Sequence, residues 1–174
     1  MRFHRLLLLA PLLSACGLIS LPEQTGNDLY VVNDLGPFKP SQVAYMDANQ
    51  LEYLKIPKLP YQQVTFDAVG TYYGTSPRLR LQFFALNHRP DCPQIESSRE
   101  GFTGALLCEG PGGGEYLTEL LVSPNSAQSV SLKNPILDQA VRDGTLYLGA
   151  RILEGNLAAD EMIKISSIRF RGRL

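Results

Sequence analysis

The strongest restriction on the fold of this chain comes from two stretches in which polar and apolar residues alternate. In RLRLQFFAL (residues 78–86) and again in IKISSIRFRGRL (163–174), every second residue is apolar over most of the stretch. Successive side chains of a β-strand point to opposite faces of the sheet, so a period of two predicts strands with one buried and one solvated face. In the second stretch the phase reverses at Ser166 and Ser167, which predicts a β-bulge there.

Other segments of strand length are separated by turns rich in glycine and proline. We expect them at residues 29–32, 51–56, 63–69, 103–109, 116–122, 129–132 and 145–153. In the last of these, the alternation predicts that Tyr147 and Arg151 point outward. The segment GTYYGTSP (70–77) carries two glycines and a proline, which favour a hairpin between the strands on either side of it.

One helix is expected at residues 134–144. Asn134 is a favoured N-cap, Pro135 is favoured at the first helical position, and Gly144 is a typical helix terminator. The apolar residues between them fall on one face of the helix, so we expect that face to pack against a sheet.

Eight or nine short strands with one short helix predict an all-β fold. The expected architecture is an antiparallel β-sandwich, with a small β-barrel as the alternative. The last strand, residues 163–174, resembles the closing strand of jelly-roll modules that bind ligands at their loop edges. This resemblance favours a jelly-roll-like sandwich and does not bear on function.

The first residues have the layout of an export signal. Arg2 and Arg5 precede an apolar run at residues 6–13, and small residues follow it, as in a secretory signal peptide. The run is shorter than the ~20 residues that a membrane-spanning helix needs. We therefore expect residues 1–15 to be a signal peptide that is removed.

Residues 13–16, Leu-Ser-Ala-Cys, resemble the lipobox of bacterial lipoproteins. The resemblance implies that Cys16 becomes the lipid-modified N-terminus and that its acyl chains anchor the protein in a membrane. Gly17 stands where such proteins commonly carry the aspartate that marks retention in an inner membrane. The resemblance thus favours the outer membrane or the cell surface of a bacterial envelope. The alternative is a secreted protein in which Cys16 is a free thiol.

The mature chain is expected to have a lipidated tether and connector at residues 16–40 and one β-sandwich domain at 41–174. Loss of the signal peptide removes two of the 16 basic residues and leaves 14 against 17 acidic ones. This near-neutral balance provides no field that would attract nucleic acid, so we expect no such partner. The expected partners are the membrane, through the N-terminal lipid, and an envelope protein or a glycan.

Cys92 and Cys108 remain as an even pair in an oxidising compartment, which predicts a disulfide. Such a bond would add about 3 kcal/mol to stability in the chain-entropy model. A zinc site is the competing idea, but His88 is the only histidine outside the signal peptide, and no paired ligand spacing occurs. We expect no metal and no cofactor. The long polar loop at 87–115 is either functional or an insertion that the disulfide restrains.

Arginines occupy outward positions of several expected strands. They are Arg78, Arg80, Arg151, Arg169, Arg171 and Arg173. If these strands are neighbours, the arginines form a cationic stripe able to bind phosphate or a polyanionic polymer. The alternative is an ordinary solvated face, whose charges also protect sheet edges from aggregation.

Motifs of the common enzyme classes do not occur in the sequence, and we expect no catalysis. His88 and Arg89 lie at the rim of a strand and are candidate binding residues. With loop carboxylates such as Glu96 and Glu100, His88 is also the basis of a hydrolase alternative. Three tyrosines offer a surface for sugar stacking, against the more ordinary interpretation of cross-strand packing: Tyr72, Tyr73 and Tyr147.

The sequence therefore favours a non-enzymatic, lipid-anchored domain of a bacterial envelope that acts by binding or has a structural role. One alternative is a carrier that holds a small apolar ligand in a β-barrel. That carrier requires inward-facing residues to line a cavity of roughly several hundred Å³ rather than to interdigitate. The other alternative is the hydrolase.

Overall fold

The structure, a computed structural model, describes residues 20, 22–33, 39–52, 60–97 and 104–173. These residues form short strands and one helix. The elements are β1 (Gln24–Thr25), β2 (Leu29–Val32), β3 (Gln42–Met46), β4 (Gln62–Tyr73), β5 (Leu79–Leu86), β6 (Gln94–Ile95), β7 (Ala105–Glu109), β8 (Glu115–Val122), β9 (Ala127–Lys133), α1 (Pro135–Asp143), β10 (Tyr147–Glu154) and β11 (Met162–Arg173).

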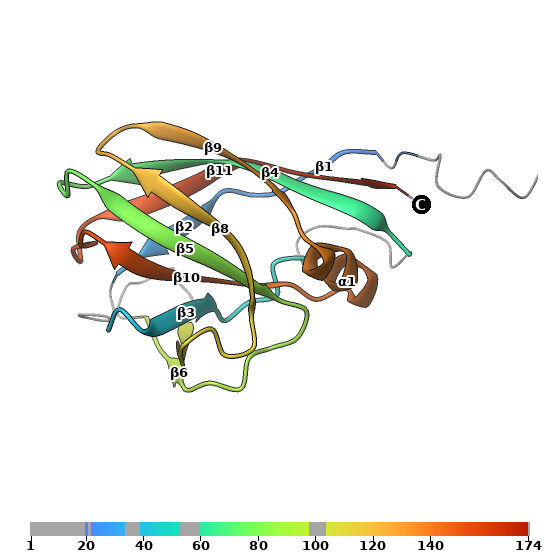
Figure 1. Cartoon of the computed structure of the whole chain (residues 1–174), viewed down its shortest axis with the longest axis horizontal. Helices are drawn as coiled ribbons and strands as arrows, with labels where there is room; N and C mark the ends of the chain where they lie inside the picture. Colours follow the sequence, from blue (N-terminus) through green and yellow to red (C-terminus); the bar gives the residue numbers. More distant parts are fainter. Residues whose placement is uncertain (1–19, 21, 34–38, 53–59, 98–103, 174) are drawn as a thin grey trace, which may run out of the picture.

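The strands form two antiparallel sheets, which are the two layers of Figure 1. The first sheet has the order β1-β11-β4-β9, with β2 also paired to β11, and the second has the order β6-β7-β3-β10-β5-β8. Four pairs are nested along the chain: β2 with β11, β3 with β10, β4 with β9 and β5 with β8. This nesting in two sheets is that of a jelly roll. The all-β sandwich is confirmed, and the alternative of a small barrel is wrong, because no described strand joins the two sheets.

The structure corrects several expectations about the strands. β1 and β2 both pair with β11, so the sandwich begins well before residue 41, where we expected it to start. Residues 70–77 do not form a hairpin, because β4 and β5 belong to different sheets. Leu51 and Glu52 lie in a turn, and the rest of the expected strand at 51–56 is outside the described residues. The described residues also add the short strands β1, β3 and β6, which the sequence pattern did not indicate.

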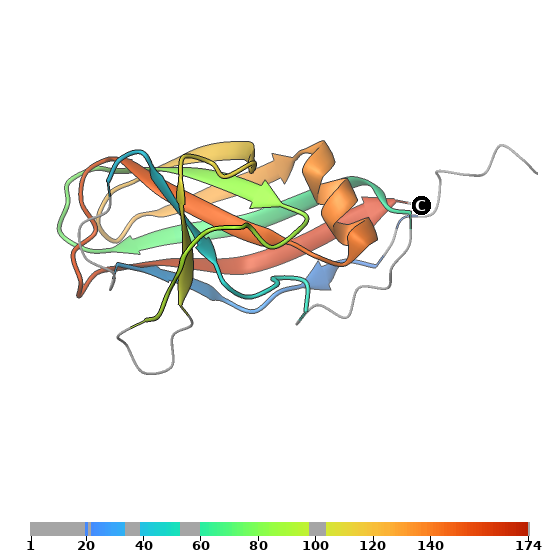
Figure 2. The same ribbon diagram turned by 90° about the horizontal axis from the view of Figure 1, so that it is seen from below.

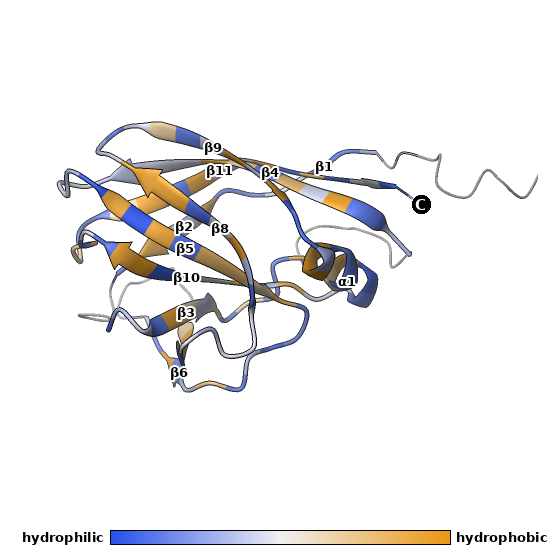
Figure 3. Cartoon of the chain, in the orientation of Figure 1, coloured by the Kyte–Doolittle hydropathy of each residue, from blue (hydrophilic) through white to orange (hydrophobic). Residues whose placement is uncertain are grey.

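The bulge in the last strand is confirmed. The register between β11 and β4 shifts between Ser166 and Arg169, and Ser167 has a φ of 53°. The shift brings Ile168 and Phe170 back to the face that Ile163 already occupies, and all three side chains are buried. Polar and apolar residues alternate along strands such as β5 (Figure 3), and buried apolar residues of both sheets form the main core.

Helix α1 closes one end of the sandwich, at the end where the C-terminus lies (Figures 1 and 2). Both expected caps are confirmed: the Asn134 side chain accepts a hydrogen bond from the Ile136 backbone N–H, and Gly144 ends the helix in the left-handed conformation, with a φ of 73°. The apolar face of α1 is buried in the main core. The Asp138 carboxylate also accepts a hydrogen bond of 2.7 Å from the Val64 backbone N–H, which joins α1 to the start of β4.

Loss of the N-cap is expected to have a measurable cost. Replacing Asn134 with alanine leaves the Ile136 N–H, which its side chain now satisfies at 2.9 Å, without that partner. We expect the free energy of unfolding to fall by about 1 kcal/mol, measured by urea denaturation. The control is Gln139→Ala on the exposed face of the same helix, which should change stability little. An equal effect of both substitutions would contradict a capping role.

Candidate functional site

The interior of the sandwich is not filled along its whole length. A cavity of about 540 Å³ lies between the sheets and is lined by residues from β2, β4, β9 and β11 on one side and from β3, β5, β8 and β10 on the other. Protein interiors are normally packed to the density of organic crystals, with few voids larger than a water molecule. A cavity of this size is within the range of small-molecule sites, about 300–1,000 Å³.

The side chains around the cavity show how it arises. Ala44 and Ala150 are direct neighbours on β3 and β10, and Ala68 lines the cavity from the facing sheet. Sheets in a sandwich pack ~10 Å apart, and large inward side chains must fill that space. Three alanines do not fill it. Several large apolar residues that pack against the core are consequently only partly buried: Leu29, Val31, Phe83, Leu117, Val130, Leu148 and Ile152.

Among the described residues, the cavity opens at one lateral edge of the sandwich. At the opposite edge β8 and β9 pack against each other. Asn125 lies in the connection between β8 and β9, and its backbone N–H donates to the Tyr72 carbonyl, which joins this connection to β4. β2 and β3 occupy corresponding positions in the two sheets, but these two described strands have no comparable packing. Partly exposed residues of this edge, including Tyr30, Met46 and Gln50, line the cavity. The mouth therefore lies between β2 and β3.

Two charged residues, Asp28 and Arg151, occur among the described residues that line the cavity, and each interacts with another side chain. Asp28, at the mouth, lies 2.7 Å from the Lys164 amine. This hydrogen bond raises the pKa of Lys164, which therefore stays charged at neutral pH. Arg151 donates from Nε to Gln82 at 2.7 Å, and its guanidinium lies over the ring of Phe84, on the outer face of the sheet. Neither charge is left free to face the interior.

A buried carboxylate fixes the end of the sandwich opposite α1. Glu161 accepts hydrogen bonds from the Tyr72 hydroxyl, from the backbone N–H and hydroxyl of Thr75, and from the Ala158 backbone N–H. Burial alone would raise its pKa, but these hydrogen bonds outweigh burial and lower the pKa from 4.5 to about 2. Leu157, which precedes Ala158 in the segment held by these hydrogen bonds, is part of the cavity wall. Glu161 thus holds part of that wall in place.

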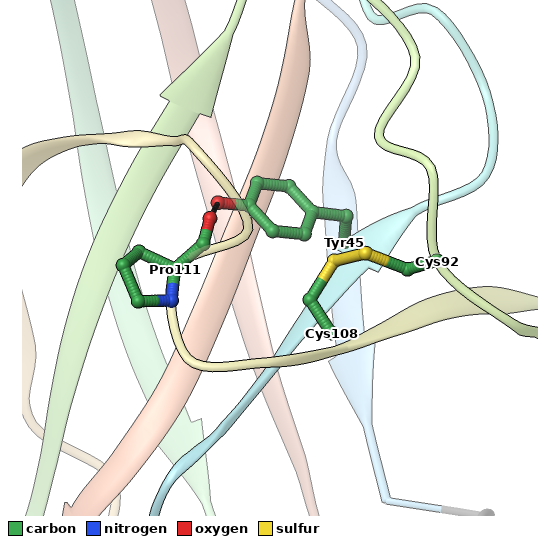
Figure 4. The surroundings of a disulfide bond; sticks show 4 residues. All are labelled: Tyr45, Cys92, Cys108 and Pro111. Carbon is green, nitrogen blue, oxygen red and sulfur yellow. Dashed lines mark hydrogen bonds between the residues drawn. A yellow bond between two sulfur atoms is a disulfide. The ribbon is translucent and has the colours of Figure 1, made fainter.

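The disulfide between Cys92 and Cys108 is confirmed, with a Cα–Cα distance of 5.1 Å. It restrains the loop that covers the outer face of the second sheet, where the loop and the sheet form a second, smaller core. In Figure 4 the Tyr45 ring lies beside the disulfide and its hydroxyl donates to the Pro111 carbonyl. Burial raises the pKa of Tyr45 to about 12, so this hydroxyl stays protonated. Position 112 requires glycine for two reasons. Its backbone is left-handed (φ 57°), and a Cβ there would lie 2.7 Å from the Cys108 sulfur.

This second core supports the cavity from behind. In β3, Val43 and Tyr45 are buried under the loop, while Gln42, Ala44 and Met46 line the cavity. The same strand is thus one wall of the cavity and one wall of the disulfide core.

The candidate arginines are divided between the two sheets. Those on or beside β5 and β10 of the second sheet are Arg78, Arg80 and Arg151, and those on β11 of the first sheet are Arg169, Arg171 and Arg173. The condition for a single cationic stripe, that all these strands be neighbours, is not met. Carboxylates also lie among them: the Arg80 guanidinium is 3.3 Å from Glu154, and Arg171 pairs with Asp67. These contacts are those of a solvated, mixed-charge face.

The other candidate residues are also separated. His88 is exposed, and its one hydrogen bond within the described residues joins Nδ1 to the Asn87 side chain at 3.1 Å. Arg89 pairs with Asp47 at 2.5 Å. Glu100 lies outside the described residues, so its pairing with Glu96 has no structural description. His88, the general base of the hydrolase alternative, therefore contacts no carboxylate among the described residues.

The three tyrosines do not form a shared exposed surface, so the alternative of sugar stacking is not supported and the more ordinary interpretation of packing is favoured. Tyr72 is fully buried and Tyr147 is 8% exposed in the second core, while Tyr73 is 42% exposed. Tyr147 points to the outer face of the second sheet, as the alternation predicts, but the disulfide loop covers that face and buries it.

Comparisons with known proteins do not assign a family: no protein-family model matches the chain, and no curated protein matches it. In the part of the chain that the structure describes, no helix has the length and hydropathy needed to span a bilayer. Within the same residues, no group of three or more histidine, cysteine, aspartate or glutamate side chains is arranged to hold a metal ion. Cys16, the expected lipidation site, lies outside the described residues.

The cavity is the site that the sequence patterns missed. Two of its small residues, Ala68 and Ala150, stand at positions that the alternation predicts to point inward. Small residues at inward positions of several strands were the available signal. Their meaning depends on which strands face one another, which only the topology supplies.

Proposed function

We propose that this protein is an exported, lipid-anchored envelope protein whose β-sandwich binds one apolar molecule between its sheets without altering it chemically. The observation that carries the proposal is the cavity of about 540 Å³ with its mouth between β2 and β3. Of the functions expected from the sequence, the carrier is thus favoured over a purely structural role, with a hollow sandwich in place of the expected barrel.

The cellular location in this proposal rests on the resemblance of residues 13–16 to a lipobox. The start of the described chain supports a close approach to a membrane: Ser20 forms a β-bridge with Arg173 at the end of β11. From Cys16 to Ser20 a fully extended chain spans at most about 14 Å. A lipid on Cys16 would hold the sandwich beside the bilayer, with the end that carries α1 nearest to it.

Filling the cavity is expected to abolish binding without harming the fold. Nile red, an uncharged apolar fluorophore, should bind the purified domain with enhanced emission. Ala44→Phe and Ala150→Phe add large side chains inside the cavity, and each should weaken the affinity for Nile red by about tenfold or more. The melting temperature should stay equal or rise, because the new rings occupy empty space.

The matched control is Ser129→Phe, which places the same ring on the exposed outer face of β9. Its affinity for Nile red should equal that of the unmodified protein. If all three variants bind equally well, or if the unmodified protein does not bind Nile red at all, the proposed function is wrong.

A further inference from the structure

The wall of the cavity sets the chemistry of what fits inside. Away from the mouth its described side chains are mostly apolar, such as Phe66, Leu81, Leu120 and Leu132. Thr118 is a polar exception, and its hydroxyl donates to the Glu119 carbonyl. Burying a polar group without a hydrogen-bond partner costs roughly 2–7 kcal/mol. The part of a ligand that lies deep in the cavity must therefore be hydrocarbon.

The rim sets the chemistry of the part that stays at the mouth. Its polar side chains among the described residues include Gln42, Gln50 and Asp28. The Gln42 amide already donates to Glu109, and the Gln50 amide already donates to the Ala48 carbonyl, but a side-chain amide has two N–H donors and so each can make a further hydrogen bond. Asp28 has its charge paired with Lys164 on the outer side of β11. A negative ligand end beside Asp28 would be repelled by its carboxylate and would have to compete with it for Lys164, the cation that already pairs with Asp28. The described rim offers no cation that is unpaired. An uncharged alcohol, ester or amide would meet no such repulsion.

We infer that the ligand is a single-chain amphiphile whose hydrocarbon chain lies between the sheets and whose uncharged polar end stays at the mouth between β2 and β3. This inference rests on the proposed function. The cavity volume of about 540 Å³ suits one small molecule rather than a lipid with two long chains. A domain held beside a bilayer has such amphiphiles within reach.

Competition against bound Nile red tests the inference. A monoacylglycerol and a fatty acid of the same chain length are titrated below their aggregation concentrations at about pH 8, where a carboxylic acid is ionised. The monoacylglycerol should displace Nile red at a concentration about tenfold or more below that of the fatty acid. In Asp28→Asn the fatty acid should bind several-fold more tightly and the monoacylglycerol should bind unchanged. The matched control is Asp160→Asn, which removes an exposed carboxylate at another turn and should alter neither ligand.

The outcomes separate the inference from the function on which it rests. If the fatty acid displaces Nile red as well as or better than the monoacylglycerol, the uncharged end is wrong and the apolar site remains. If Asp28→Asn changes neither ligand, the rim carboxylate does not select between them and the argument from the rim fails. If Nile red is displaced by neither compound although it binds, the ligand is not a single-chain amphiphile. If Nile red does not bind, the proposed function fails and the inference fails with it.

Discussion

Replacing Glu161 with alanine is expected to lower the free energy of unfolding by about 3 kcal/mol. Glu161 is 5% exposed and is the acceptor for four donor groups. Removing it leaves these donors buried without their partner, and a buried group without its partner costs about 1–3 kcal/mol. For a domain of this size the melting temperature should fall by about 6–12 °C.

The effect of Glu161 should depend on pH in a defined direction. Its pKa in the folded protein, about 2, is lower than the ordinary value of 4.5. The unfolded state therefore binds a proton more readily, so the contribution of Glu161 is full above about pH 5 and is lost as the pH falls towards 2. Each unit of pKa difference is worth about 1.36 kcal/mol, which gives about 3 kcal/mol at neutral pH.

Urea denaturation of the unmodified protein and of Glu161→Gln, at several pH values between about 7 and 2.5, measures this contribution. The difference in stability between the two proteins should shrink towards zero at the acid end. Glu115→Ala, which removes an exposed carboxylate of β8, is the control and should cost little. A difference that does not change with pH would mean that Glu161 stabilises the fold by packing and not as a charged acceptor.

Local pattern predicted the longer strands but missed the short strand β3. Strands such as β4, β5 and β11 were predictable because burial on one face makes apolar residues recur with a period of two. The bulge at Ser166 and Ser167 was predictable for the same reason: the apolar phase reverses there. Helix α1 was predictable because its cap residues, Asn134 and Gly144, act locally. These features depend only on residues close together in the chain.

Sheet membership was not predictable in the same way. The turn residues at 74–77 allow a hairpin as readily as a crossing between the two sheets. The choice depends on pairing with strands far along the chain: β4 pairs with β9 and β11, whereas β5 pairs with β8 and β10. Alternation placed Tyr147 on the outer face of β10 but did not show that this face is buried, because the second sheet is covered on both faces. The continuous apolar run Phe83–Leu86 in β5 was the available sign, since strands buried on both faces lose their alternation.

Removing the disulfide is expected to destabilise the protein by a similar amount but in a different region. Cys92 and Cys108 are 16 residues apart in the sequence, and a loop of this length is worth about 3 kcal/mol in the chain-entropy model. Cys92→Ala/Cys108→Ala should therefore lower the melting temperature by about 6–12 °C. Reduction of the unmodified protein should have the same effect, and reducing agent should not change the double variant further.

Hydrogen exchange distinguishes where the stability is lost. β7 carries Cys108 and pairs with β3, whose Tyr45 packs against the same loop. Without the disulfide, amide protection should fall in β7 and β3 while β4 and β11, in the other sheet, keep theirs. Because β3 also forms one wall of the cavity, the affinity for Nile red should weaken in the double variant, whereas a merely global loss of stability would leave binding by the folded fraction unchanged. An unchanged melting temperature on reduction would show that packing, not the covalent bond, holds the loop against the sheet.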